Sequence, residues 1–313
     1  MSLYNLITVL GPTASGKTLF GAHLAQALNG EIISADSRQV YKGMNLGTGK
    51  DYEDYMVKDK TIPVHLVDIH EAGYKYNLYE FQEDFVMAFD DISTRKKIPV
   101  MVGGTGLYIE AILDKYRLVK VPLNQELRNS LDGKTQEELA EILRRYDTDL
   151  HNTTDLKIRK RTIRAIEIAD YYSRNQTHPD DQPEIRSLIF GIKYDRNSRR
   201  KRITERLRAR LNEGMLEEAR SLLEKIPSDD LIYYGLEYKF LTLHLTGEIT
   251  YQEMFNKLEV AIHQFAKRQM TWFRKMERHG FDIHWLDGHL PLDEKIARSL
   301  RIISREAPEL IIK

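Results

Sequence analysis

Short apolar segments alternate with amphipathic segments over the first hundred residues. Four apolar segments rich in β-branched residues predict strands, at 6–10, 31–35, 64–69 and 98–102. Helical spacing of the apolar positions predicts helices between them, at 17–28 and 78–94. Strands that alternate with helices favour a parallel sheet covered on both faces, and such sheets bind ligands at the carboxyl ends of their strands.

The pattern changes near Lys120 and changes back near Ser187. Between them the sequence is charged and helical, and 187–194 indicates a strand that returns to the sheet. We therefore expect an inserted helical module at 119–186, within a core formed by 1–118 and 187–313. Inside the module the expected elements are helices at 136–146 and 156–172 and a loop at 178–183. After it, the expected helices are 198–212, 216–225, 236–245 and 251–278.

The composition restricts where the protein works. The chain of 313 residues has no cysteine, which excludes disulfides and thiolate metal sites and favours a reducing compartment. Its first residues do not resemble a signal peptide, and no apolar run approaches the roughly 20 residues that span a bilayer. We expect a cytoplasmic monomer without membrane association.

Charge leaves nucleic-acid binding open. Lys plus Arg equals Asp plus Glu, 47 each, whereas nucleic-acid binders usually carry a basic excess. Phosphate contacts depend on what one face presents, and 196–210 contains Glu205 as its only acid. This stretch predicts either a binding surface or a solvated helix face.

The segment from Gly11 to Thr18 reads GPTASGKT, a match to the phosphate-loop pattern G-x-x-x-x-G-K-[ST]. It follows a predicted strand and opens a predicted helix, where backbone N–H groups and the helix dipole attract phosphate. Lys17 would neutralise the outer phosphates, and the Thr18 hydroxyl would hold Mg²⁺. The residues expected at the phosphates are Gly11, Thr13, Ala14, Ser15, Gly16, Lys17 and Thr18. Together with the strand pattern, this predicts an α/β fold: a P-loop NTPase-like parallel sheet core with an inserted helical module and a helical C-terminal part.

The loop alone does not choose the phosphate compound. A kinase or NTPase usually adds a carboxylate at the end of a second apolar strand, and Asp68 could supply it. The strand at 98–102 ends instead in Gly103-Gly104, without an acid. On these grounds a kinase and another phosphate-ester transferase remain equally open.

Further segments carry a family resemblance. They are 34–44 (SADSRQVYKGM), 46–48 (LGT), 63–68 (PVHLVD), 103–108 (GGTGLY) and 267–274 (KRQMTWFR). With the phosphate loop, and in this order, they resemble the tRNA dimethylallyltransferase family, also called tRNA isopentenyltransferases. The similarity runs from Gly11 to Arg274, which is most of the chain.

The resemblance implies a reaction and roles for its residues. The phosphate loop would hold the pyrophosphate of dimethylallyl diphosphate with Mg²⁺, and the nucleophile would be the exocyclic amine of the adenine 3′ to the anticodon in tRNA. Asp36 would take the proton of that amine, unless it is a helix cap or a magnesium-linked carboxylate. Thr105 would bind pyrophosphate or amine, or cap the following helix. Arg202 or Arg206 would reach the pyrophosphate, Arg206 being favoured, unless they form exposed ion pairs with Glu205 or Glu213.

The resemblance also implies an acceptor surface that takes a base extruded from the anticodon loop. Its expected residues are Asp36, Ser37, Arg38, Gln39, Arg128, Lys160, Arg161, Arg164, Lys267, Arg268, Gln269, Trp272 and Arg274. In the last group cations are interleaved with Trp272 and Phe273, and we expect at least one of these two rings to be a core residue of an amphipathic helix.

Three departures from the family pattern concern the acceptor rather than the chemistry. The segment 232–239 reads IYYGLEYK, the position of a usual arginine holds His263, and the arginine motif at 159–167 is only loosely kept. Three alternatives to tRNA prenylation remain. They are a sibling enzyme that prenylates free adenine nucleotides, a small-molecule kinase, and a non-catalytic RNA-binding module.

Overall fold

The chain forms two compact units, described here from a computed structural model of residues 4–116, 118–146, 156, 158–175 and 183–311. Unit 1 comprises 1–116 and 183–313, and unit 2 comprises 117–182. The sequence pattern had placed the inserted module at 119–186. The loop expected at 178–183 lies, apart from Pro183, outside the described residues.

The chain leaves and re-enters unit 1 at two points that are close to one surface hollow. This hollow is lined by Leu113 and Ile185, which are near those points, together with Tyr4 and Phe281.

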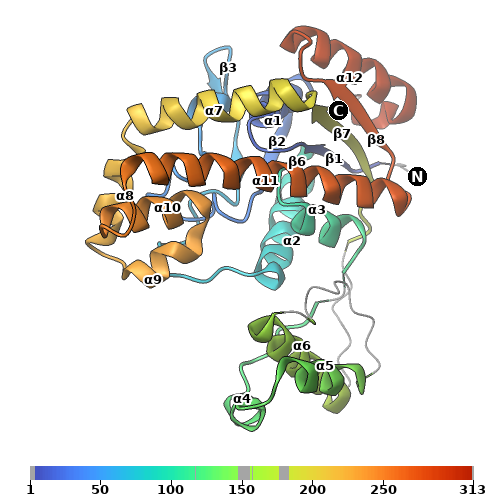
Figure 1. Ribbon diagram of the computed structural model, residues 1–313. Helices are drawn as coiled ribbons and strands as arrows, with labels where there is room; N and C mark the ends of the chain where they lie inside the picture. The colour runs from blue at the N-terminus through green and yellow to red at the C-terminus, as the bar shows by residue number, and fades with distance from the viewer. Residues whose placement is uncertain (1–3, 117, 147–155, 157, 176–182, 312–313) are drawn as a thin grey trace. The chain divides into compact units, whose positions relative to one another are not determined.

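Unit 1 is built on a six-stranded sheet in which every pairing is parallel (Figure 1). Its strands, in spatial order, are β5 (Val64–His65), β2 (Gly30–Ala35), β6 (Ile98–Gly103), β1 (Leu6–Leu10), β7 (Ser187–Lys193) and β8 (Ile283–Asp287). The strand predicted at 64–69 was wrong beyond His65, because Leu66 (φ 63°) and Asp68 (φ 55°) adopt left-handed backbone that ends an extended segment.

The side chains of the central strands alternate between two apolar layers. Leu6 and Leu10 of β1 face one layer, and Ile7 and Val9 face the other. The second layer is completed by α1 (Lys17–Ala27) and α12 (Leu292–Glu306). Both faces of the sheet are therefore covered, as the nearly continuous apolar strands predict.

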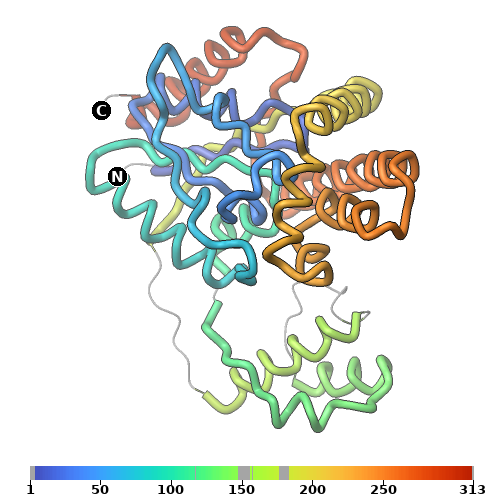
Figure 2. Tube along the Cα trace, turned by 90° about the vertical axis from the view of Figure 1, so that its left-hand side faces the viewer, coloured from blue at the N-terminus to red at the C-terminus, as the bar shows by residue number. Residues whose placement is uncertain are grey.

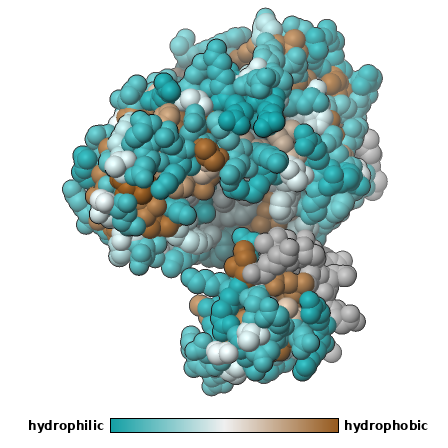
Figure 3. Space-filling view, in the orientation of Figure 1, coloured by the Kyte–Doolittle hydropathy of each residue, from teal (hydrophilic) through white to brown (hydrophobic). Residues whose placement is uncertain are grey.

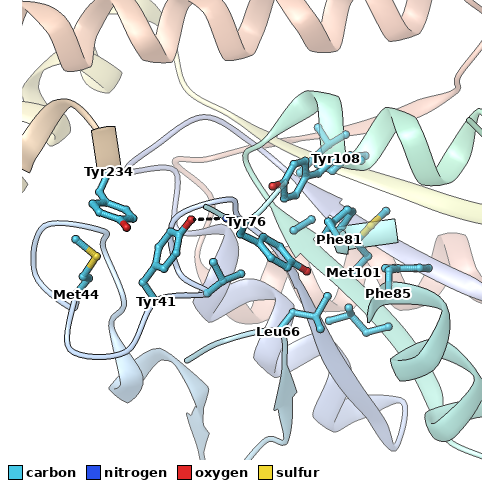
Figure 4. Close-up of a cluster of buried hydrophobic side chains, with 14 of the residues drawn as sticks. Tyr41, Met44, Leu66, Tyr76, Phe81, Phe85, Met101, Tyr108 and Tyr234 are labelled. Atoms are coloured by element: carbon cyan, nitrogen blue, oxygen red, sulfur yellow. Dashed lines mark hydrogen bonds between the residues drawn. The ribbon is translucent and has the colours of Figure 1, made fainter. Parts of the chain in front are cut away.

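The first layer is completed by the larger group of helices. They are α2 (Leu78–Thr94), α3 (Gly106–Leu113), α7 (Arg196–Asn212), α8 (Met215–Leu223), α10 (Leu236–Leu245) and α11 (Tyr251–Arg278). Figure 2 shows α7, α10 and α11 grouped on one side of the sheet. Around Tyr41 this layer is aromatic: the ring of Tyr234 lies edge-on at 4.8 Å, and the Tyr41 hydroxyl accepts a hydrogen bond from the Tyr76 amide (Figure 4).

Three helices have the limits that the sequence pattern predicts. The limits of α2, α10 and α11 are those expected from sequence, and Asn77 and Thr250 form capping boxes at the starts of α2 and α11. The sequence indicated a helix after Gly104, where α3 begins, but it had not indicated α12, β8 or α4 (Gln125–Leu131). The remaining short elements are η1 (Tyr52–Tyr55), β3 (Met56–Val57), β4 (Lys60–Thr61), α9 (Ser228–Leu231), η3 (Ile232–Tyr234) and η4 (Pro308–Leu310).

Unit 2 is a small helical module. Besides α4 it contains α5 (Gln136–Arg144) and α6 (Arg159–Arg174), close to the two helices expected there. Its core is a small apolar cluster: Leu131, Leu139, Leu143, Ile166 and Ala169. In the described parts of the chain, no helix has both the length and the apolar character needed to cross a membrane.

Candidate active site

The phosphate loop joins β1 to α1 at the carboxyl edge of the sheet. Gly16, with φ 76°, lies in the left-handed region at the N-cap of α1, where a side chain would be strained. The hydroxyl of Ser15 is buried without a hydrogen-bond partner in the structure, and the Thr18 hydroxyl makes no hydrogen bond to any described residue. A buried hydroxyl without a partner is costly, so this loop is suited to a ligand rich in acceptor oxygens.

Lys17 is the cation of this loop. Burial lowers the pKa of its amine to about 8, although the nearby acids Asp36, Asp54 and Asp51 act in the opposite direction. It forms no hydrogen bond or ion pair with the described residues. Its Cε lies only 3.4 Å from where a Cβ on Gly104 would stand, so a glycine there gives the lysine room. Lys17 is thus a partly desolvated cation whose counter-charge an anionic ligand can supply.

Gln269 of α11 connects the phosphate loop to the loop after β6. Its side-chain oxygen accepts a hydrogen bond from the Thr13 amide at 2.9 Å, and its side-chain nitrogen donates to the Gly104 carbonyl at 2.8 Å. The residue is buried, and both of its polar side-chain atoms are engaged. The structure therefore gives Gln269 a positioning role inside the site, in place of the predicted contact with tRNA.

Asp36 and Thr105 follow the neighbouring strands β2 and β6. The Asp36 Oδ1 accepts a hydrogen bond from the Arg38 amide at 2.9 Å, while its Oδ2 has no hydrogen-bond partner among the described residues. Thr105 occupies the N-cap of α3, but its side chain does not cap the helix. Its hydroxyl accepts instead from the Ser37 amide at 3.2 Å, so the two loops are tied together beside the free carboxylate oxygen.

Arg202 and Arg206, one turn apart on α7, make different contacts. Arg202 Nε donates to the Ala14 carbonyl of the phosphate loop at 3.0 Å, and its guanidinium lies 4.6 Å from the centroid of the Tyr194 ring. Arg206 pairs with Asp51 at 2.7 Å, and its charge lowers the pKa of Lys17 after the stronger effect of burial. Neither forms the exposed pair with Glu205 or Glu213 that was the alternative for them.

Sequence reasoning missed three acids. Burial alone would raise the pKa of Asp51, but Arg206 and Arg210, which lies 2.7 Å from it, outweigh burial and lower that pKa. Burial, with the charge of Asp51, raises the pKa of Asp54. Burial also raises the pKa of Glu237, the second residue of α10. The only signals in the sequence were two aspartates three apart after a Gly-Thr-Gly-Lys segment and a glutamate shortly after Gly235.

Glu218 of α8 holds the loop that precedes Asp51. Its carboxylate accepts hydrogen bonds from the amides of Asn45, Leu46 and Gly47 at 2.8–3.0 Å and from the Tyr238 hydroxyl at 2.7 Å. It therefore fixes the loop that carries Asp51.

Asp68, the carboxylate that a kinase would need near the phosphate loop, makes its hydrogen bonds to other residues. Asp68 accepts hydrogen bonds from the buried Lys50 amine and from the Tyr52 hydroxyl. The acids whose charges act most on Lys17 are Asp36, Asp54 and Asp51, and Asp68 is not among them. This geometry disfavours the kinase interpretation that the sequence alone had left open.

The acceptor-facing candidates of unit 1 divide into exposed and packed residues. Lys267, Arg268 and Arg274 are exposed on α11, and the face drawn in Figure 3 is predominantly hydrophilic along α7 and α11. Trp272 packs against Gly106, where a Cβ would meet its ring at 2.4 Å, and Phe273 is buried. Gln39 is also buried, and it donates to the Gly49 carbonyl at 3.0 Å. Ser37 and Arg38, by contrast, are half-buried.

The candidates of unit 2 divide in the same way. The Arg128 guanidinium makes two hydrogen bonds, of 2.7 and 2.8 Å, to the buried carboxylate of Glu167, and Arg164 binds that carboxylate at 3.0 Å. Lys160 and Arg161 are exposed and bind no other described side chain. Arg128 and Arg164 therefore stabilise the module, and Lys160 and Arg161 remain available to a partner.

No cluster of three or more acidic or histidine side chains suited to a metal occurs among the described residues. A magnesium ion here would depend on the Thr18 hydroxyl and on phosphate oxygens of the substrate, a common arrangement for this ion.

Comparison with known proteins assigns this site to a family. The family model described as IPP transferase matches residues 39–276. The chain belongs to the IPP transferase family. It is 59% identical over 294 residues to tRNA dimethylallyltransferase 2 of Bacteroides fragilis, covering 94% of this chain and 96% of the relative. It is 56% identical to tRNA dimethylallyltransferase 1 of Parabacteroides distasonis, covering 98% and 100% of the two chains.

Solved structures agree with the fold. The full-length tRNA isopentenylpyrophosphate transferase of Bacillus halodurans is similar with a TM-score of 0.72 and 29% identity, covering 98% of this chain and 97% of that one. A eukaryotic dimethylallyltransferase crystallised while acting on tRNA has a TM-score of 0.77 at 22% identity, covering 96% and 80%, a likeness of fold. The predicted resemblance and fold class are thereby confirmed.

Proposed function

We propose that this protein transfers a dimethylallyl group from dimethylallyl diphosphate to the exocyclic amine of the adenine 3′ to the anticodon in tRNA. A carbon–nitrogen bond forms, the carbon–oxygen bond to the diphosphate breaks, and pyrophosphate and one proton are released. The observation that carries the proposal is the placement of Asp36 after β2 and of Thr105 after β6. These two strands are adjacent, and β6 also pairs with β1, the strand that leads into the phosphate loop and Lys17.

The phosphate loop would bind the diphosphate. Among the described residues, the buried Ser15 hydroxyl has no hydrogen-bond partner and the Lys17 amine forms no ion pair. Arg202 touches the loop itself, so its charge would add to that of Lys17 as pyrophosphate leaves. Arg206, the residue favoured from sequence, forms an ion pair with Asp51. It would therefore act on the pyrophosphate through its charge and without direct contact.

Mg²⁺ would be held by Thr18, whose hydroxyl makes no hydrogen bond to any described residue. When bound, the ion would stabilise the negative charge that develops on the leaving pyrophosphate.

Asp36 would accept the proton of the amine. The amine nitrogen is weakly basic because its lone pair is delocalised into the ring, so removal of the proton assists bond formation. The Asp36 Oδ1 accepts a hydrogen bond from the Arg38 amide, and its Oδ2 would receive the proton. The hydroxyl of Thr105 lies at the adjoining loop, where it would orient the amine or a phosphate oxygen.

The acceptor is proposed to be tRNA because the relatives that match nearly the whole chain are named for it. The exposed cations of the two units suit contacts with a phosphate backbone: Lys160, Arg161, Lys267, Arg268 and Arg274. A free nucleotide would need none of them, so no observation favours the sibling reaction on adenine nucleotides.

The test incubates the purified protein and Mg²⁺ with labelled dimethylallyl diphosphate and either an anticodon stem-loop or AMP. Label on the stem-loop alone supports the proposal, and a parallel reaction with EDTA should lose it. Label on AMP alone would move the acceptor to free nucleotides. Label on neither, with ATP consumed, would overturn the proposal.

A further inference from the structure

An exposed tyrosine ring lies close to two cations, near the loop that carries Asp36. Tyr233, on η3, is 47% exposed. The Arg38 guanidinium lies 5.4 Å from the centroid of its ring, and the Lys75 amine lies 5.9 Å from it. Arg38 is only two residues beyond Asp36, whose side chain holds its amide. This ring therefore belongs to the surroundings of the carboxylate that faces the acceptor.

The residue next to Tyr233 ties η3 to a neighbouring segment. Tyr234, which meets Tyr233 edge-on at 5.7 Å, is buried, and its hydroxyl accepts a hydrogen bond from the Gly73 amide and donates one to the Tyr74 carbonyl. The segment that carries Lys75 is thus tied to η3. Figure 4 shows Tyr234 packed against Tyr41, at the base of this arrangement. Three segments distant in sequence are held together before any ligand arrives, which reduces the entropy lost on binding.

A second aromatic pair extends the same surface. Tyr74 is 43% exposed, and its ring stacks on His70 with centroids 4.3 Å apart and planes inclined by 13°. Single exposed aromatic residues are common and need no explanation. Two exposed rings joined by one hydrogen-bonded segment, with a guanidinium over one of them, form a surface of the kind on which unpaired bases stack.

The charges of this surface favour bases over phosphates as its ligand. The Lys75 amine forms an ion pair with the Asp230 carboxylate at 3.4 Å, and the Lys42 amine forms one with the Glu71 carboxylate at 2.9 Å. Two of the local cations are therefore already balanced, which would weaken a purely electrostatic contact. Stacking depends on ring area instead. Arg38, which forms no ion pair with another described residue, adds a cation–π contribution.

We propose that Tyr233, with Arg38 and Tyr74, forms a stacking platform for an unpaired base of the acceptor RNA next to the target adenine. This inference rests on the proposed function, because it needs an RNA acceptor. It assigns a specificity-determining surface to η3 and to the segment before α2, separate from the cations of α11.

The test measures binding of an anticodon stem-loop and single-turnover prenylation for Tyr233→Leu and Tyr233→Phe. Leucine keeps apolar bulk but removes the ring, and phenylalanine keeps the ring. We expect Tyr233→Leu to weaken stem-loop binding about tenfold, the effect of losing one stacked base, and Tyr233→Phe to bind within about twofold of wild type. The matched control is Tyr251→Leu, an equally exposed tyrosine (47%) at the start of α11.

A stem-loop with an abasic site on either side of the target adenine identifies the stacked base. At the right position, the abasic RNA should bind wild type and Tyr233→Leu equally, because the contact is already missing. Equal binding of intact RNA by Tyr233→Leu and wild type, with prenylation retained, would overturn the platform and leave the proposed function standing. Failure of the wild type to label RNA would instead remove the proposed function.

Discussion

The amide nitrogen of Ser37 lies 3.2 Å from the hydroxyl oxygen of Thr105 and donates a hydrogen bond to it. This one contact joins the loop after β2 to the loop after β6, immediately beside Asp36. Because reacting groups must be placed within a fraction of an ångström, the contact would position Asp36 for its proposed role as base.

Thr105→Val should therefore reduce turnover while keeping the shape of the side chain. Valine leaves the Ser37 amide without its acceptor, and we expect turnover at saturating substrates to fall about tenfold or more. Thr105→Ser restores the hydroxyl and should return most of the rate. A valine variant as active as wild type would show that the contact has no part in the reaction.

Asp36→Asn should separate chemistry from binding. Asparagine retains an oxygen for the Arg38 amide but cannot take a proton, so single-turnover rates should fall by about 10²- to 10⁴-fold. Affinity for dimethylallyl diphosphate, measured by calorimetry, should stay within a few-fold of wild type. A rate loss below about threefold would remove Asp36 from the role of base.

Binding of dimethylallyl diphosphate should depend on pH through Lys17. Burial lowers the pKa of its amine to about 8 in the free protein, so the amine is charged below that pH and neutral above it. The charged form binds the diphosphate, and the dissociation constant should therefore rise as pH increases through about 8. Calorimetry in buffers of different ionisation enthalpy should detect proton uptake there. Lys17→Met should bind weakly at every pH, without this transition.

Asp51→Asn should move that transition to lower pH. The charge of Asp51 raises the pKa of Lys17, against the larger effect of burial, and Asp51 also balances Arg206 and Arg210. Without it the amine should lose its proton more readily, so binding should weaken already below pH 8. Glu53→Gln, which neutralises an exposed acid on η1, is the matched control and should leave the transition in place.

Gln269→Leu should lower both stability and affinity for the diphosphate. The change leaves the Thr13 amide and the Gly104 carbonyl without partners, at about 1–3 kcal/mol for each buried group. Thermal denaturation should show a melting temperature several degrees lower, with a partial recovery when diphosphate is added. Gln264→Leu, at an exposed position of the same helix, should change neither.

Residues on adjacent parallel strands were predictable as neighbours. The phosphate loop, Asp36 and Thr105 each follow a strand, and β1, β6 and β2 are adjacent in the sheet, so their carboxyl ends meet. Asp51 and Glu237 could not be found in this way. One lies in a loop held by Glu218, and the other lies at the start of α10, so their places depend on tertiary packing between distant helices.

Tertiary packing also explains why two residues predicted at the acceptor RNA make other contacts in the structure. Arg128 and Gln269 were expected at the RNA because of their motifs, yet each binds a group within its own unit. Whether a polar side chain of a helix faces inward depends on the partner across from it, which helical periodicity alone does not reveal. Tyr233 lies in the segment 232–239, which departs from the family pattern, and its exposure and its neighbours distinguish it within that segment.

The entry and exit of unit 2 have an evolutionary consequence. The chain leaves unit 1 after Tyr116 and re-enters at Pro183, and Leu113 and Ile185 line one hollow near these points. Unit 2 is thus a single insertion into the chain of unit 1, and it has its own apolar cluster. A lineage could lengthen, shorten or exchange it by recombination at two nearby junctions, while inheriting the sheet and the phosphate loop of unit 1 unchanged.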